Sequence, residues 1–138
     1  MRLADFKVSV IENQDVMKGE IQNKFAEPEQ CPVRNVLDRI GDKWSMLVLL
    51  LLEEKGLLRF NEIDKHIATI SQKMLSVTLK GLQADGLVKR TIYPQVPPKV
   101  EYELTELGQT LIPHLNILVE WAKNNMSKIE ASRLQYKS

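Results

Sequence analysis

The sequence predicts a mainly α-helical fold with a small β-hairpin (α+β) and a long C-terminal helix. Apolar side chains recur at three- and four-residue spacing through most of residues 31–125, as amphipathic helices require. Two short segments of strand composition flank a proline-rich turn at residues 94–98. With 138 residues, the chain has room for one domain and its terminal elaborations. We expect an N-terminal arm at residues 1–30 that packs on a partner subunit, a domain at 31–104, and a C-terminal helix and tail at 105–138.

The domain is predicted to open with two helices. Pro32 suits a first helical turn, and the helix that it begins should end at Gly41. Asp42 is expected to cap a second helix, which Gly56 ends. The run Trp44–Leu52 is apolar nearly all round, so this second helix should form the buried centre of the domain.

A second pair of helices is predicted next. Leu57–Phe60 has the composition of a short extended segment, and Asn61 precedes a helix that carries Ile63 and Ile67. Ser71 is the expected N-cap of the following helix, which ends at Asp85 and Gly86. Its inner face comprises Met74, Leu75, Thr78, Leu79 and Leu82.

The hairpin follows directly. Its predicted strands are Leu87–Tyr93 and Val100–Leu104, and in the second of them apolar residues alternate with Glu101 and Glu103. Thr105 then caps the long C-terminal helix. A helix pair followed by a two-stranded hairpin is the order of a winged helix-turn-helix.

Positive charge is concentrated in this part of the chain. The formal net charge is only +1, but residues 71–100 carry five basic side chains and one acidic side chain. A local phosphate-binding surface requires such a concentration, although many chains contain some basic window without binding nucleic acid.

The helix that opens at Ser71 has the chemistry of a DNA recognition helix. Small and long polar side chains on its outer face suit a major groove about 12 Å wide. The hairpin beside it carries cations that suit contact with the DNA backbone or the minor groove. The alternatives are a solvated helix face and a plain surface turn. The candidate DNA-binding residues are Ser71, Gln72, Lys73, Ser76, Val77, Lys80, Lys89, Arg90, Pro98 and Lys99.

Eight short segments carry a family resemblance: Cys31–Val33, Ile40–Trp44, Arg59–Ile63, Ile70–Leu75, Leu79–Leu82, Asp85–Arg90, Val96–Tyr102 and Leu104–Gly108. In order and spacing they resemble HxlR-type winged helix-turn-helix transcriptional regulators, bacterial relatives of the MarR group. The resemblance covers about residues 31–125. It implies a homodimer with the 71–84 helix in the major groove of an operator and the wing at 94–99 beside it.

The resemblance also implies that the C-terminal helix and the N-terminal segment build the dimer contact. An apolar stripe on the C-terminal helix suits a helix–helix seam, and the alternative is a core within one subunit. The stripe comprises Leu107, Leu111, Leu115, Leu118 and Ala122.

Cys31 is the single cysteine. Some members of the family that the chain resembles sense oxidants or electrophiles through a cysteine at the matching position. A thiol at a helix N-terminus has its thiolate stabilised by the helix dipole, which favours reactivity. The alternative is that Cys31 is a small packing residue beside Pro32.

Other classes of function find little support in the sequence. The longest apolar run, Met46–Leu52, is far shorter than the ~20 residues that span a bilayer, and no signal peptide is evident. His66 and His114 lie on separate helices without a cysteine or carboxylate pair at metal-ligand spacing. We therefore expect a cytoplasmic DNA-binding regulator with no enzymatic activity, no cofactor, no metal and no membrane partner. The runner-up is a winged helix that binds another protein and not DNA. The sequence identifies neither an inducer nor an operator.

Overall fold

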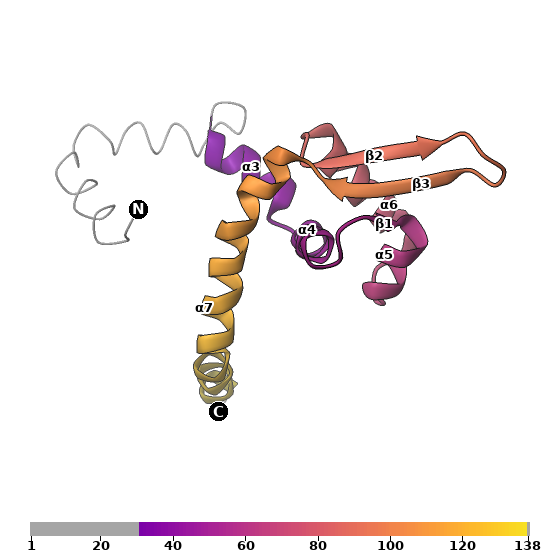
Figure 1. Ribbon diagram of the computed structural model, residues 1–138. Coiled ribbons are helices and arrows are strands. Elements are labelled where there is room, and N and C mark those ends of the chain that lie inside the picture. The colour runs from indigo at the N-terminus through magenta and orange to yellow at the C-terminus, as the bar shows by residue number, and fades with distance from the viewer. Residues whose placement is uncertain (1–30, 138) are drawn as a thin grey trace. The chain divides into compact units, whose positions relative to one another are not determined.

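The computed structural model describes residues 31–137 (Figure 1). The described residues fall into two units, 31–42 and 43–137, and each is described by itself. The arm predicted at residues 1–30 lies outside the described residues, and the domain boundaries predicted after residues 30 and 104 stay predictions. Within residues 31–137, no helix is both long enough and apolar enough to cross a membrane.

In the first unit, helix α3 spans Pro32–Ile40, as the sequence predicts. Gly41 ends it by donating its backbone N–H to the carbonyl of Leu37 at 2.7 Å. Of the four residues that define the apolar stripe of α3, only Ile40 is buried; the other three, Val33, Val36 and Leu37, are at least half exposed.

The second unit contains four helices and three strands among its described residues. They are α4 (Lys43–Lys55), β1 (Leu58–Arg59), α5 (Phe60–His66), α6 (Gln72–Ala84), β2 (Val88–Tyr93), β3 (Lys99–Leu104) and α7 (Glu106–Lys137). The mainly helical α+β fold is confirmed, and so is the order of helix pair, hairpin and long final helix.

Helix α4 lies at the centre of this unit. It contacts α5, α6, α7 and β3, and its Val48, Leu49 and Leu52 are at most 2% exposed. An almost wholly apolar helix is stable only when other elements cover most of its circumference. The prediction of a central helix is confirmed, but its burial is incomplete, since Leu47 is 44% exposed. The other buried apolar side chains around it are Leu58, Ile63, Ile67, Ile70, Leu75, Leu79, Leu82, Val88, Tyr102, Ile112 and Leu115.

The sheet has the strand order β1-β3-β2, and both pairings are antiparallel. The hairpin of β2 and β3 was predicted, but the pairing of β1 with β3 was not. Only Leu58 and Arg59 of the predicted extended segment form a strand. Helix α5 begins at Phe60 and not after Asn61, because the Glu62 carboxylate accepts the backbone N–H of Arg59 at 2.9 Å and fixes the helix start there.

Two glycines shape the passage from α6 through the hairpin to α7. Gly86 has φ +76°, a left-handed conformation that turns the chain after α6. A Cβ at Gly108 would lie 2.2 Å from the Leu87 carbonyl oxygen, so the start of α7 approaches the start of β2 as closely as backbones allow. Thr105 caps α7 as predicted, since its Oγ1 accepts the backbone N–H of Gly108 at 3.0 Å.

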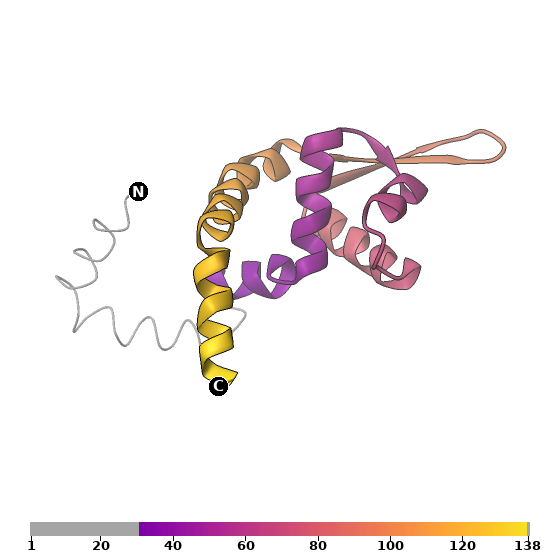
Figure 2. The same cartoon turned by 90° about the horizontal axis from the view of Figure 1, so that it is seen from below.

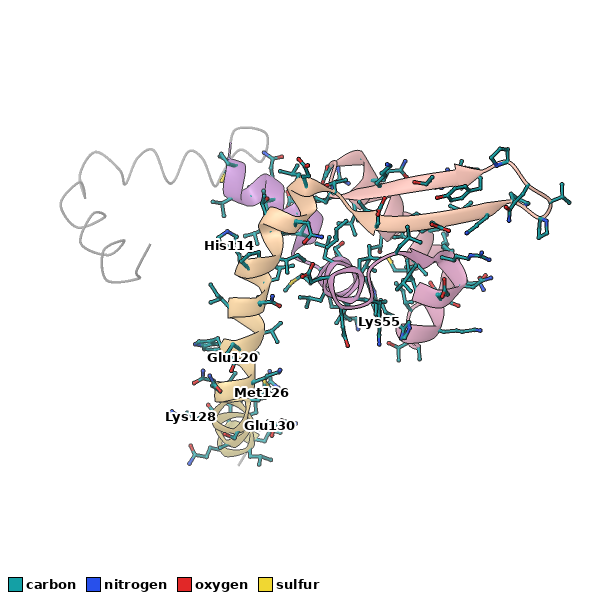
Figure 3. The ribbon with its side chains drawn as sticks, in the orientation of Figure 1. Lys55, His114, Glu120, Met126, Lys128 and Glu130 are labelled. Atoms are coloured by element: carbon teal, nitrogen blue, oxygen red, sulfur yellow. The ribbon has the colours of Figure 1, made fainter. Side chains whose placement is uncertain are left out.

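Two parts of the second unit project from its core. The β2–β3 hairpin extends beyond α5 and α6 in both ribbon views (Figures 1 and 2). Helix α7 leads away from the sheet, and none of its side chains after Leu115 is buried. Figure 3 shows side chains of this C-terminal half, among them Glu120, Met126, Lys128 and Glu130, arrayed around the helix.

Candidate nucleic-acid interface

Helix α6 begins with the predicted cap. Ser71 is in an extended conformation, and its Oγ accepts the backbone N–H of Met74 at 3.0 Å. The Ser71 carbonyl accepts the N–H of Leu75 at 2.9 Å. Because the first N–H groups of a helix otherwise lack acceptors, this cap fixes the residue at which α6 begins.

The two faces of α6 differ as the sequence predicts. Leu75, Leu79 and Leu82 are at most 1% exposed and anchor the helix in the core. The outer face, which we define as Lys73, Ser76, Val77 and Lys80, has three exposed residues, and only Ser76 is half-buried. Gln72 is exposed at the N-terminal end of the helix. The outer face is thus a continuous stripe that carries two lysines.

The prediction for Met74 was wrong. It was assigned to the inner face with Leu75, but its side chain is 42% exposed. At 100° per residue, Met74 stands at the edge of the stripe that Leu75, Leu79 and Leu82 define. Thr78, which lies closer to that stripe, is buried as expected.

The hairpin of β2, β3 and its tip at residues 94–98 forms a wing beside α6. Helix α6 contacts β2, so α6 and the wing belong to one packed unit. Lys89 and Arg90 are exposed on β2, and Pro98 is exposed at the tip. The tip also carries Val96, which is fully exposed.

Lys99 differs from the other candidate cations. Its Nζ lies 2.7 Å from Oε1 of Glu101, and only 30% of its side chain is exposed. The same Nζ lies 5.1 Å from the centroid of the Tyr93 ring. Lys99 is therefore partly withdrawn from solvent and already engaged within the wing.

The burial of Glu101 departs from the alternation seen in the sequence. That alternation puts Glu101 on a polar strand face, but the residue is only 6% exposed. Strand β3 is central, and Glu101 pairs with Arg59 of β1 on one side and with Thr91 of β2 on the other. The cause is thus β1, whose two residues gave no sequence signal strong enough to predict the pairing.

An open pocket of about 470 Å³ lies where β1, the start of α5 and β3 meet. Its charged lining residues are two cations and two carboxylates, so it has no net charge. The lining residues are Leu57, Arg59, Asn61, Glu62, Lys99 and Glu101. No sequence pattern indicated this pocket, because its walls come together only through the pairing of β1 with β3.

The predicted dimerisation stripe on α7 is divided by the fold. Leu115 is 5% exposed and belongs to the core of its own subunit, while Leu111 and Ala122 are half-buried. Leu107 and Leu118 are 56% and 48% exposed. Other large apolar side chains of α7, which the prediction omitted, are also exposed. They are Ile117, Trp121, Met126, Leu134 and Tyr136.

Cys31 lies in the first unit, as the N-cap of α3. Its Sγ accepts the backbone N–H of Arg34 at 3.3 Å, and the side chain is 2% exposed. The predicted position at a helix N-terminus is confirmed. The burial agrees with the alternative that Cys31 is a small packing residue beside Pro32.

Within residues 31–137, no group of three or more histidine, cysteine, aspartate or glutamate side chains is placed to hold a metal ion. His66 is exposed at the end of α5, and His114 is exposed on α7 (Figure 3).

Comparison with known proteins agrees with this geometry. The profile of a family described as "HxlR-like helix-turn-helix" matches residues 39–130. A helix-turn-helix transcriptional regulator of Halalkalibacterium halodurans is 47% identical over 109 residues, which are 79% of this chain and 96% of that protein.

Solved structures of transcriptional regulators are also similar to this chain in sequence and fold. The reduced form of the redox regulator HypR is 44% identical, with a TM-score of 0.68 over 72% of this chain and 98% of that one. A MarR-family transcriptional regulator from Porphyromonas gingivalis is 36% identical, with a TM-score of 0.64 over 72% of this chain and 96% of that one. The resemblance and the winged-helix fold inferred from the sequence are both confirmed.

Proposed function

Because the chain belongs to the HxlR-like helix-turn-helix family of transcriptional regulators, we propose that it binds operator DNA sequence-specifically as a homodimer. It acts in the cytoplasm, without catalysis and without a cofactor. Helix α6 enters the major groove, and the wing contacts the DNA backbone or the minor groove beside it.

The observation that carries the proposal is the outer face of α6. Three buried leucines hold the helix while Lys73, Val77 and Lys80 stand exposed on its other side. An α-helix with its side chains is about 10–12 Å across, which matches the width of the major groove. Lysine bonds guanine or phosphate, and the Val77 side chain suits apolar contact with a thymine methyl.

The N-terminal end of α6 adds to this face. Ser71 and Gln72 are both exposed there. Glutamine bonds adenine in a bidentate manner, and the backbone N–H groups of a helix N-terminus favour a nearby phosphate. We assign Ser71 and Gln72 to this end of the interface.

The wing supplies the second contact region. Lys89 and Arg90 are exposed on β2, and the proline-rich tip ends at Pro98 and Lys99. Cations beside a recognition helix fix the register of a protein on the duplex, while the groove-inserted residues select the sequence.

The dimer is proposed to form through α7. Leu118 and Trp121, about half exposed, lie in the part of the helix that follows its last buried residue, Leu115. Large apolar side chains that stand exposed close together on one helix suit a contact with a second subunit. A twofold homodimer binds a pseudo-palindromic operator whose half-sites are about one helical turn, or a multiple of it, apart.

In vitro selection from random duplex DNA at a stated salt concentration tests the proposal. We expect a pseudo-palindromic consensus, whose binding is then measured for Lys80→Glu. This variant should lose about 100-fold or more in specific affinity, because one cation–base or phosphate contact becomes a repulsion. It should remain dimeric, since Lys80 lies on the outer face of α6.

Lys55→Glu is the matched control, because it makes the same charge change at an exposed lysine of α4, outside α6, the wing and the proposed dimer helix. It should retain affinity to within about threefold at moderate salt, as expected for a charge outside the contact region. Undiminished binding by Lys80→Glu, or an equal loss in both variants, would contradict the placement of α6.

The competing function is a winged helix that binds a protein partner and not DNA. Salt dependence separates the two functions, because DNA affinity falls with a slope of about −0.9 per phosphate contact in a plot of log K against log[salt]. Failure to select any duplex over heparin would favour the competing function.

We further propose that Cys31 makes DNA binding responsive to oxidants. Two observations support this second function: Sγ accepts an N–H at the start of α3, and the chain is similar to the redox regulator HypR. With one cysteine per chain, a disulfide requires the partner subunit's cysteine or a small thiol.

The test compares operator binding by the wild type and Cys31→Ser after mild peroxide treatment. We expect the affinity of the wild type to change and that of the variant to stay constant. An equal response of both proteins would contradict a role for Cys31.

A further inference from the structure

The wing contains an ion pair that alters the role expected of its last cation. Lys99 and Glu101 are two residues apart on β3, so their side chains share one face of the strand. The 2.7 Å between Nζ and Oε1 is a direct charge-assisted hydrogen bond. Lys99 is therefore not a solvated cation of the kind that Lys89 and Arg90 present.

Glu101 is the more constrained partner. It is 6% exposed in the central strand, between Arg59 of β1 and Thr91 of β2. A buried carboxylate requires a charge partner or several hydrogen bonds. Lys99 supplies that partner, so moving the Lys99 ammonium to a DNA phosphate would leave the buried carboxylate without it.

Lys99 is also tied to the opposite strand. It is the register partner of Tyr93, and this pair is the last before the tip at residues 94–98. The Lys99 ammonium lies over the Tyr93 ring at 5.1 Å, within the range of a cation–π interaction. Lys99 thus contacts Glu101 on its own strand, β3, and Tyr93 on β2. These contacts join the two strands at the base of the tip.

We propose that Lys99 is an internal brace of the wing and not a phosphate contact, and that Glu101 is a positioning residue that sets the direction of the tip. The proposal rests on the proposed function. The cations left to neutralise DNA phosphates are then those of the α6 face and of β2: Lys73, Lys80, Lys89 and Arg90.

Salt dependence distinguishes a brace from a contact. Operator affinity is measured by fluorescence anisotropy from low to moderate salt for the wild type, Lys99→Gln and Lys89→Gln. A lost phosphate contact lowers the slope of log K against log[salt] by about 0.9. We expect that reduction of the slope for Lys89→Gln alone. Lys99→Gln should instead lose about threefold to tenfold in affinity at every salt concentration, as expected when an interaction between two contacting residues is lost.

A mutant cycle then tests the pairing. Glu101→Gln should lose as much affinity as Lys99→Gln, and the double variant should lose no more than the larger single loss, because both changes break one interaction. Lys99→Arg should restore most of the affinity, since guanidinium also pairs with a carboxylate. Additive losses would contradict the pairing.

Footprinting separates positioning of the tip from general stability. With hydroxyl radicals, Lys99→Gln should lose protection at the position of the wing and keep it where α6 binds. Thermal unfolding of each variant checks its folding, and if Glu101→Gln does not fold, Lys99→Gln alone decides. A slope reduced by about 0.9 in Lys99→Gln overturns the brace. Absence of salt-dependent binding by the wild type would instead overturn the proposed function.

Discussion

Helix α6 and the wing are the two regions proposed to contact DNA, and the fold supports them in different ways. The outer face of α6 stands on leucines that are at most 1% exposed. The tip of the wing has no such foundation: Val96 is fully exposed, and the base of the tip is joined by strand pairing and the contacts of Lys99. The difference teaches that a recognition helix depends on the core for its position, whereas a wing depends on its own strands.

The largest expected effect comes from the support of α6. Leu79→Ala removes a side chain that is 1% exposed, so it leaves a cavity. We expect a loss of about 2–5 kcal/mol in the free energy of unfolding, measured with denaturant. The matched control is Val77→Ala on the outer face, where Val77 is 56% exposed. It should change stability by no more than about 0.5 kcal/mol, and equal losses in the two variants would show that α6 is not anchored as described.

A smaller effect is expected at the start of α6. Ser71→Ala removes the acceptor of the Met74 N–H, and the loss of such a cap costs about 1 kcal/mol of unfolding free energy. Ser76→Ala, on the same helix but not at its start, is the control and should cost less. Chemical denaturation measures both. A greater loss for Ser76→Ala would indicate that the cap does not determine where α6 begins.

The smallest effect on stability is expected at the tip of the wing. Val96 is fully exposed, so Val96→Ala should leave the free energy of unfolding unchanged to within about 0.5 kcal/mol. If the tip contacts the duplex, operator affinity should nevertheless fall. Thermal unfolding and anisotropy on the same samples separate the two effects. A stability loss comparable to that of Leu79→Ala would mean that the tip is supported by the core after all.

Much of the candidate interface could be predicted because its signals are local. The N-cap at Ser71 needs only a hydroxyl three residues before the N–H that it accepts. The inner leucines of α6 follow from helical spacing, and their burial is confirmed. Met74 was misplaced because it stands at the boundary of the apolar stripe, where spacing alone does not decide between core and solvent.

The dimerisation stripe illustrates the limit of periodicity. Leu115 and Leu118 are both apolar and three residues apart on α7, yet one is 5% exposed and the other 48%. Both residues fit a helix seam equally well in the sequence. Only the tertiary packing, in which α7 contacts α4 and β3, decides that Leu115 is buried within its own subunit.

The sequence by itself determined the helices, the caps at Ser71 and Thr105, the hairpin and the family, because these depend on neighbours within a few residues or on motifs in a fixed order. The tertiary structure alone decided that β1 pairs with β3 and that Glu101 is buried. The reason is physical. Strand pairing and burial bring together residues some forty positions apart, and no local pattern of charge or hydropathy records which of them will meet.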